Sequence, residues 1–135
     1  MAAFNKFRSF VEAEAEKKHN LGSDQLKIAL SNTIPVNTNA VLADITQIAY
    51  TNLSAREVTT SSSAQTAGTY KLVLDDLTLT ASGVVATFQY VILYNDTATN
   101  KELIGWWDVG TPITMASLYT FLINFDASAG VLQKS

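Results

Sequence analysis

The stretch VVATFQYVILY, residues 84–94, is apolar at most of its odd-numbered and most of its even-numbered positions. Successive side chains of a β-strand point to opposite faces of the sheet, so both faces of this stretch are expected to be buried. Burial on both faces is typical of a strand at the centre of a sheet. The polar run NDTATN, residues 95–100, is a loop signal that ends it. We therefore expect a central strand over residues 84–94.

Segments on either side of this strand predict an antiparallel sheet structure. In residues 24–31, Leu26, Ile28 and Leu30 alternate with more polar neighbours, as in a half-buried strand. The polar residues 61–68 are expected to form a loop or an edge strand. Other alternating or apolar runs predict strands at residues 70–74, 77–79, 103–109, 113–115, 119–126 and 131–133. Short strands separated by turn signals at this spacing favour a sandwich or a barrel.

The N-terminal segment predicts a helix over residues 2–18. Phe4, Phe7 and Val11 recur at spacings of three and four, with Phe10 beside them. Gly22 is placed to take the left-handed conformation that commonly ends a helix. This apolar stripe has two alternative roles, packing on the sheet of its own chain or docking onto a neighbouring subunit.

The remaining segment adds one short helix, and the whole chain fits one domain. Residues 41–49 carry apolar side chains at helical spacing, and Asn39 is the expected N-cap. A chain of 135 residues is the size of one domain. We expect a single mainly β domain over residues 1–135, an antiparallel β-sandwich or barrel-like fold. Its N-terminal helix lies within residues 1–20 and its β-rich core spans residues 24–135.

Composition excludes several classes of function. Charged residues make up 16% of the chain, below the usual share of about 25%. The net charge is −3 and the basic residues are scattered, which argues against a nucleic-acid partner. The chain has no cysteine, which excludes disulfides and thiolate metal sites. No apolar run approaches the length of about 20 residues that spans a bilayer, and no signal peptide is expected.

Residues suited to catalysis are scarce. His19 is the single histidine, and it follows two lysines at the end of the predicted helix. We interpret it as a solvated histidine at a helix terminus. A Ser/His/Asp set cannot be assembled without it, and glycine-rich phosphate loops are absent. We expect no catalytic residue, no metal site and no cofactor.

The carboxylates are interpreted as turn or strand-end residues that bond nearby backbone. Asp75 and Asp76 are adjacent, Asp96 lies in a loop signal, and Asp108 and Asp126 close apolar strands. A glycosidase would require two carboxylates roughly 5–10 Å apart in a cleft. Nothing in the spacing of these five residues favours such a pair.

The aromatic residues are better candidates for a binding role. Trp106 and Trp107 are consecutive in a predicted strand, so they face opposite sides of the sheet. Both can pack in the core, or one can lie at a protein interface, where tryptophan is enriched, or stack on a sugar. The candidate protein-interface residues are therefore Phe4, Phe7, Phe10, Val11, Trp106 and Trp107.

Several stretches carry a resemblance to a known family. They are FNKFRSFVEAEAEKKHNLGSDQLKIALSNTIPV, VLADITQIAY, TYKLVLDDLTLTASG, YVILYNDTATNKELIGWWDVG and FLINFDASAGVL, and LYNDT, LIGWWDVG and FDASAGVL are the most specific pieces. In these the chain resembles small virion structural proteins of tailed bacteriophages and prophages. Two regions depart from the family pattern. Residues 50–58 lack a common glycine, and MASL at residues 115–118 replaces a more polar, glycine-containing turn.

The resemblance implies a non-enzymatic role in a virus particle assembled in the bacterial cytoplasm. The favoured expectation is a capsid decoration (cement) protein that binds the outer shell and stabilises it. Its implied partners are the major capsid protein or other virion proteins, and a homo-oligomer is implied, with a trimer as a frequent form. A tail or baseplate component and a carbohydrate-binding receptor module are the alternatives.

Overall fold

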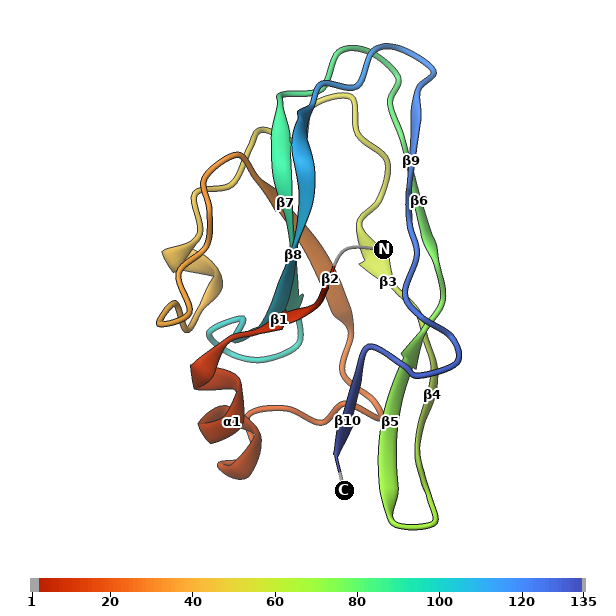
Figure 1. The fold of residues 1–135 in the computed structure, drawn as a ribbon. Coiled ribbons are helices and arrows are strands. Elements are labelled where there is room, and N and C mark those ends of the chain that lie inside the picture. Colours follow the sequence, from red (N-terminus) through yellow and green to blue (C-terminus); the bar gives the residue numbers. More distant parts are fainter. Residues whose placement is uncertain (1–2, 135) are drawn as a thin grey trace.

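The central strand of the fold is β7 (Phe88–Asn95), which forms the middle of a five-stranded antiparallel sheet in the computed structural model (Figure 1). The structure describes residues 3–134. β7 pairs with β2 (Leu26–Ser31) on one side and with the long strand β8 (Leu103–Ile113) on the other. Two short strands, β1 (Asn5–Lys6) and β3 (Glu57–Val58), form the edges.

A second layer of strands faces this sheet. It consists of β4 (Thr60–Thr66), β5 (Thr69–Leu74) and β10 (Leu132–Lys134), together with the pair β6 (Leu77–Thr80) and β9 (Thr120–Ile123). In Figure 1, β6 and β9 continue the direction of β5 and β10 towards the top of the molecule. The prediction of a mainly β, antiparallel, sandwich-like fold is confirmed.

Side chains of β7 are buried on both faces, as its sequence predicts. Val91 and Leu93 belong to the large cluster between the layers, which includes Leu72 and Leu74 of β5. Ile92 belongs to a second cluster on the opposite face. Because apolar side chains lie on both faces of β7, the strand must have other parts of the chain packed against both faces of its sheet.

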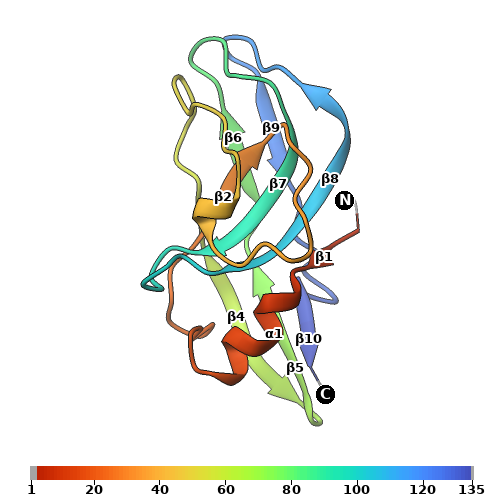
Figure 2. The same ribbon diagram turned by 90° about the vertical axis from the view of Figure 1, so that its left-hand side faces the viewer.

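The outer face of the five-stranded sheet is covered by the segment 32–48, which crosses it in Figure 2. Ile45 from this segment and Phe7 from the N-terminus contribute to the second cluster. Backbone hydrogen bonds fix the segment, including Leu103 N to Ala40 O at 3.0 Å and Leu42 N to Lys101 O at 3.0 Å. A loop therefore takes the place that a third layer would otherwise fill.

The predicted N-terminal helix is confirmed, but it is shorter than the expected residues 2–18, of which residue 2 lies outside the described part of the chain. The helix α1 spans Arg8–Ala15, and residues 3–7 before it are not helical and contain β1. β1 pairs with β8, and the Phe4 ring lies so close to Gly105 that a Cβ atom there would overlap it. Pairing with β8 gives the backbone hydrogen bonds that a first helical turn would leave unmade.

The short additional helix expected within residues 41–49 is present only as the 3₁₀ turn η1 (Leu42–Asp44). Val41, not Asn39, occupies the N-cap position, and the Asp44 carboxylate accepts hydrogen bonds from the Ala40 and Val41 amides. Beyond the turn, Ile45 and Ile48 pack in different clusters, which a continuous helix would not allow. Residues 61–68 form edge strand β4 and its turn, and residue 113 ends β8 instead of starting a new strand.

The β4–β5 hairpin offers a test of the local geometry. Ala67 and Gly68 at its turn have φ of 52° and 84°, which is the type I′ pattern that favours Asn-Gly. We expect Ala67→Asn to raise the free energy of unfolding by about 0.5–1 kcal/mol, because asparagine tolerates the left-handed region better than alanine. Urea denaturation measures this. The matched change Ala64→Asn, in extended β4, should give no gain, and a loss of stability in Ala67→Asn would contradict the turn geometry.

Candidate functional site

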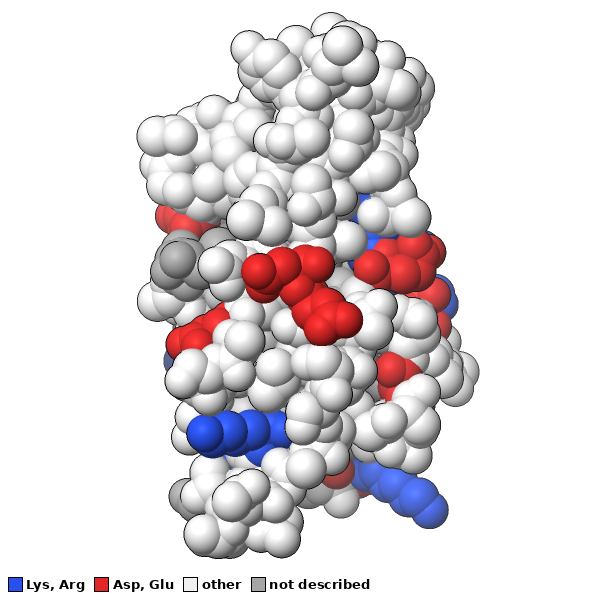
Figure 3. Space-filling view, turned by 90° about the vertical axis from the view of Figure 1, so that its right-hand side faces the viewer, with Lys and Arg blue, Asp and Glu red and all other residues white. Residues whose placement is uncertain are grey.

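One end of the sandwich lacks charged side chains. Residues 45–55, 77–95 and 109–125 contain no Lys, Arg, Asp or Glu. The fold brings parts of all these stretches together. Figure 3 views one face of the molecule, and the upper part of that face carries no acidic or basic residue. We call the surface formed by residues 51–54, 81–87, 114–119 and the exposed side of β9 the uncharged end.

Hydrogen bonds tie the connections of the uncharged end to one another. The Asn52 side chain donates to Val84 O at 3.1 Å, and Ser82 N donates to Asn52 O at 2.8 Å. Leu118 N donates to Ala81 O at 2.8 Å. These bonds join segments far apart in the sequence, so the surface is built as a unit and not as separate loops.

Large apolar side chains project from the uncharged end. Val84, Leu118, Tyr119 and Leu122 are exposed by 68%, 83%, 61% and 55%. Single exposed apolar residues are ordinary on protein surfaces, but a group of them without interspersed charge is typical of a binding surface. The central parts of protein interfaces are likewise depleted of charged residues.

Leu118 adds a second unusual feature. Its φ is 70°, in the left-handed region that a leucine adopts only at a cost of about 1–2 kcal/mol. It is also the most exposed of the large apolar residues, so its side chain gives the fold little in return. Strain of this kind is common at functional sites. The turn 115–118 thus presents a leucine at a position whose backbone conformation favours glycine.

Three of the sequence-predicted interface residues are buried in their own chain. Phe7, Phe10 and Trp107 are exposed by 0%, 2% and 4%. Trp107 lies between the rings of Phe4 and Phe125, with centroid distances of 5.0 and 5.6 Å. These three residues therefore pack within their own chain.

The other predicted residues lie apart from one another. Trp106 is on the opposite sheet face, partly buried, with its ring edge-on to Tyr90 at 6.0 Å. Val11 is 56% exposed on α1, away from the buried Phe7 and Phe10. The six residues thus do not form one surface, and an interface role for Phe4, Val11 and Trp106 stays a prediction.

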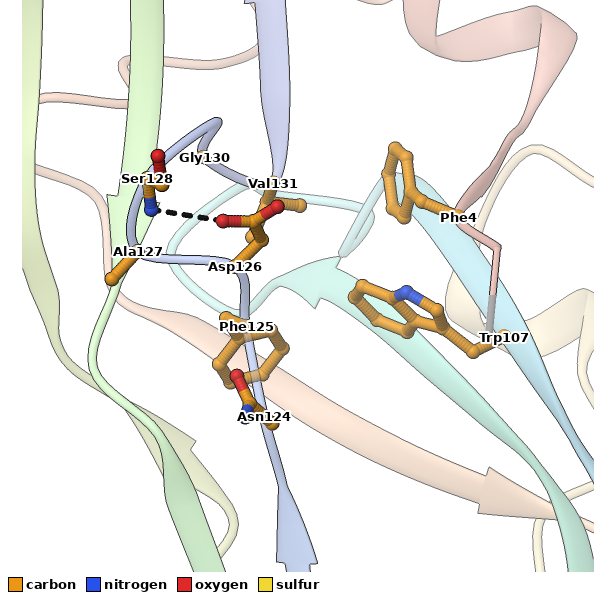
Figure 4. A pocket seen from close by; sticks show the side chains of 9 residues that line it. All are labelled: Phe4, Trp107, Asn124, Phe125, Asp126, Ala127, Ser128, Gly130 and Val131. Carbon is orange, nitrogen blue, oxygen red and sulfur yellow. Dashed lines mark hydrogen bonds between the residues drawn. The ribbon is translucent and has the colours of Figure 1, made fainter. Parts of the chain in front are cut away.

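A cavity of about 620 Å³ lies beside Phe4 and Trp107 (Figure 4). The loop 124–131 forms its other wall. The Asp126 carboxylate accepts hydrogen bonds from Ser128 N and Ala129 N, which lower the pKa of Asp126 below its usual range. Asp126 is the single carboxylate among the lining residues, so this cavity does not hold the pair that a glycosidase requires.

Two of the four remaining predicted carboxylates accept hydrogen bonds from backbone amides. Asp108 accepts from Gly110 N at 2.8 Å, and Asp76 accepts from Phe125 N at 3.0 Å. Asp96 pairs with Lys101 at 3.1 Å. Within residues 3–134, side chains suited to hold a metal ion do not gather in groups of three or more. No helix of the described chain is both long enough and apolar enough to cross a membrane.

The prediction that His19 is solvated is wrong. Its side chain is buried, with 7% exposure, and its ring centroid lies 5.2 Å from that of Phe10 in a tilted arrangement. Its Nδ1 accepts a hydrogen bond from Asn95 Nδ2 at 3.0 Å. The chain turns back at Lys17, which has a φ of 65°. After this turn His19 lies against Phe10 and Asn95 instead of in solvent.

Asn95, the last residue of β7, joins His19 to a cluster that sequence reasoning missed. Its amide nitrogen also donates to Asp24 at 2.6 Å, and its oxygen accepts from Thr97 N and Ala98 N. Glu102 is 8% exposed, and its Oε2, like Nε2 of His19, has no hydrogen-bond partner in the part of the chain that is described. No local motif announces this cluster, because its members come from distant parts of the sequence.

No family model, curated protein or solved structure matches this chain. The geometry of the described residues therefore indicates the site. The uncharged end combines exposed apolar side chains, missing charge and a strained leucine, whereas the His19 cluster and the carboxylates are largely engaged in internal bonds. The uncharged end is the candidate functional site.

The strain at Leu118 can be measured. We expect Leu118→Asn to keep the free energy of unfolding unchanged or to raise it by up to about 1 kcal/mol, because asparagine is better tolerated at positive φ. Leu122→Asn, a change at another exposed leucine but in a strand, should not stabilise. Thermal denaturation of both variants gives the comparison. A loss of more than about 1 kcal/mol in Leu118→Asn would show that the leucine supports the fold.

The burial of His19 predicts a pH dependence of stability. Burial, countered by the charges of Glu102, Glu14 and Asp24, lowers the pKa of His19 below its ordinary 6.5. As the pH falls below 6.5, the unfolded chain binds a proton that the native state resists, so stability is lost until the native pKa is passed. His19 is the single histidine, so His19→Gln should lose less stability than the parent between about pH 7.5 and 5.5 in chemical denaturation. Parallel curves would contradict the effect.

Proposed function

We propose that the protein is a non-enzymatic structural protein of a tailed-phage virion, a capsid decoration protein that attaches through its uncharged end. The observation that carries the proposal is the group of exposed apolar residues around Leu118 on a surface without charge. Binding to another protein removes the apolar area of such a surface from water, which stabilises the complex by about 25 cal/mol per Å² of apolar area buried. The resemblance of the sequence to virion structural proteins supplies the identity of that partner.

The distribution of charge supports attachment in one orientation. In Figure 3 the acidic and basic residues occupy the middle and lower parts of the face, away from the uncharged end. A molecule divided in this way binds at one end and keeps the other end solvated. The net charge of −3 also suits a position on the outside of a shell better than one against packaged DNA.

A small contact is sufficient for such a role. A decoration protein occurs in many copies on a regular lattice, and geometrically matched weak contacts add up to strong attachment.

The carbohydrate-binding alternative has less support, because Trp107 is 4% exposed and offers no open ring face for a sugar. A tail or baseplate component would use the same kind of surface as a decoration protein. The location of labelled protein in virion micrographs distinguishes these two roles.

Binding to capsids tests the proposal. We expect the purified protein to bind expanded capsids of the phage that encodes it at a fixed stoichiometry and to raise their disruption temperature. Leu118→Asn should weaken binding at least about tenfold, since central apolar anchors of interfaces commonly contribute more than about 1 kcal/mol. Sedimentation with capsids measures the binding, and thermal release of DNA measures the stabilisation.

A matched control keeps the result specific. Ile34→Asn changes another large apolar residue, which is 56% exposed on segment 32–48 over the outer face of the five-stranded sheet. This variant should leave capsid binding unchanged. Equal losses in both variants would argue against the uncharged end as the contact. Labelled protein found on tails alone in virion micrographs would overturn the decoration role in favour of a tail component.

A further inference from the structure

β4 is an edge strand whose outer side has no partner among residues 3–134. It pairs with β5 on one side, and the sheet order β10-β5-β4 ends there (Figures 1 and 2). Its sequence, TSSSAQT, contains no charged residue and no proline. The register shift at Thr60–Ser62 lies at its start, so the strand is regular from Ser62 to Thr66. A regular edge of this kind is a template for another strand.

Other edges of the two larger sheets are protected in the usual ways. β1 and β3 are two residues long and carry Lys6 and Glu57, and β10 is three residues long and carries Lys134. Short strands and charged side chains are the devices that prevent edge-to-edge pairing. β4 has seven residues and neither device, so it differs from the other edges of these two sheets in the property that controls association.

The hairpin register shows which backbone groups of β4 point outward. In a two-residue hairpin the residues that flank the turn, here Thr66 and Thr69, form a hydrogen-bonded pair. Hydrogen-bonded pairs alternate along an antiparallel ladder, so Ala64 bonds Lys71 in the next such pair. The N–H and C=O groups of Ser63 and Gln65 therefore point away from β5. Within the described chain, these outward donors and acceptors are left without a strand to pair with.

The geometry points to a two-fold dimer in which β4 pairs antiparallel with β4 of a second copy, centred on Ala64. In this register Ser63 of each copy lies opposite Gln65 of the other, and the two residues exchange both of their outward backbone hydrogen bonds. Ala64 lies opposite Ala64, as a close pair of small side chains. The two three-stranded sheets then become one continuous sheet.

A second copy fits this edge for two reasons. The outward backbone groups are self-complementary about Ala64, which is the property that a two-fold interface requires. Ser, Thr, Ala and Gln side chains also place no charge opposite a like charge, although each whole chain carries a net −3. This inference goes beyond attachment to a virion and does not depend on it, because the dimer is expected of the isolated protein in solution.

Disulfide trapping tests the register, and the chain suits it because it has no cysteine of its own. Ala64 would form a non-hydrogen-bonded pair with its copy, at a Cα separation of about 4.5 Å, within the range that a disulfide spans. We expect Ala64→Cys to convert mostly to a covalent dimer under mild oxidation at micromolar concentration. Ala127→Cys, an equally small change on an exposed loop, should stay mostly monomeric.

Sedimentation equilibrium supplies the second measurement. The parent protein should show a reversible dimer, and Ala64→Lys, which sets two lysines opposite each other, should raise the dimer dissociation constant about tenfold or more. Three results would overturn the inference: a monomer at all concentrations, equal cross-linking of the Ala64→Cys and Ala127→Cys variants, or a trimer that Ala64→Lys leaves intact. None of these results bears on capsid attachment, so the two proposals fail separately.

Discussion

Burial of β7 on both of its faces is the constraint on which the rest of the structure depends. Val91 and Leu93 require an apolar layer on one side, and Ile92 requires cover on the other. The second layer of strands meets the first need, and the segment 32–48 with Phe7 meets the second. Because this segment must lie flat on the sheet, it forms a turn and hydrogen bonds to neighbouring strands and does not form the expected helix.

The same constraint accounts for the N-terminus. Trp107 leaves the sheet towards the space between the layers and is enclosed by Phe4 and Phe125, while Trp106 leaves by the opposite face. The approach of Phe4 requires that Gly105 have no side chain. A glycine beside two tryptophans thus leaves room for the Phe4 ring where β1 pairs with β8, and most of the apolar stripe is buried inside the domain.

With the aromatic residues used internally, the association surfaces are found elsewhere. The uncharged end presents apolar side chains from connections between strands, and Leu118 is held there at a cost in backbone strain. The outer edge of β4 presents backbone groups and almost no apolar area. The two surfaces differ in physical character, one driven by burial of apolar area and one by directional hydrogen bonds, so the protein can use both at once.

The sequence by itself determined the β-rich antiparallel fold and a central strand within residues 84–94, because apolar side chains on both faces are a local property of a buried strand. The structure shortens that strand at its start, since β7 begins at Phe88 and Val84 is exposed. It also identified Trp106 and Trp107 as facing opposite ways. Only the tertiary structure decided that His19 is buried, since its partner Asn95 lies 76 positions away. The uncharged end was equally hidden, although the missing charges are visible in the sequence. Distant stretches become one surface only when strand pairing brings their connections together, and no local period encodes that pairing.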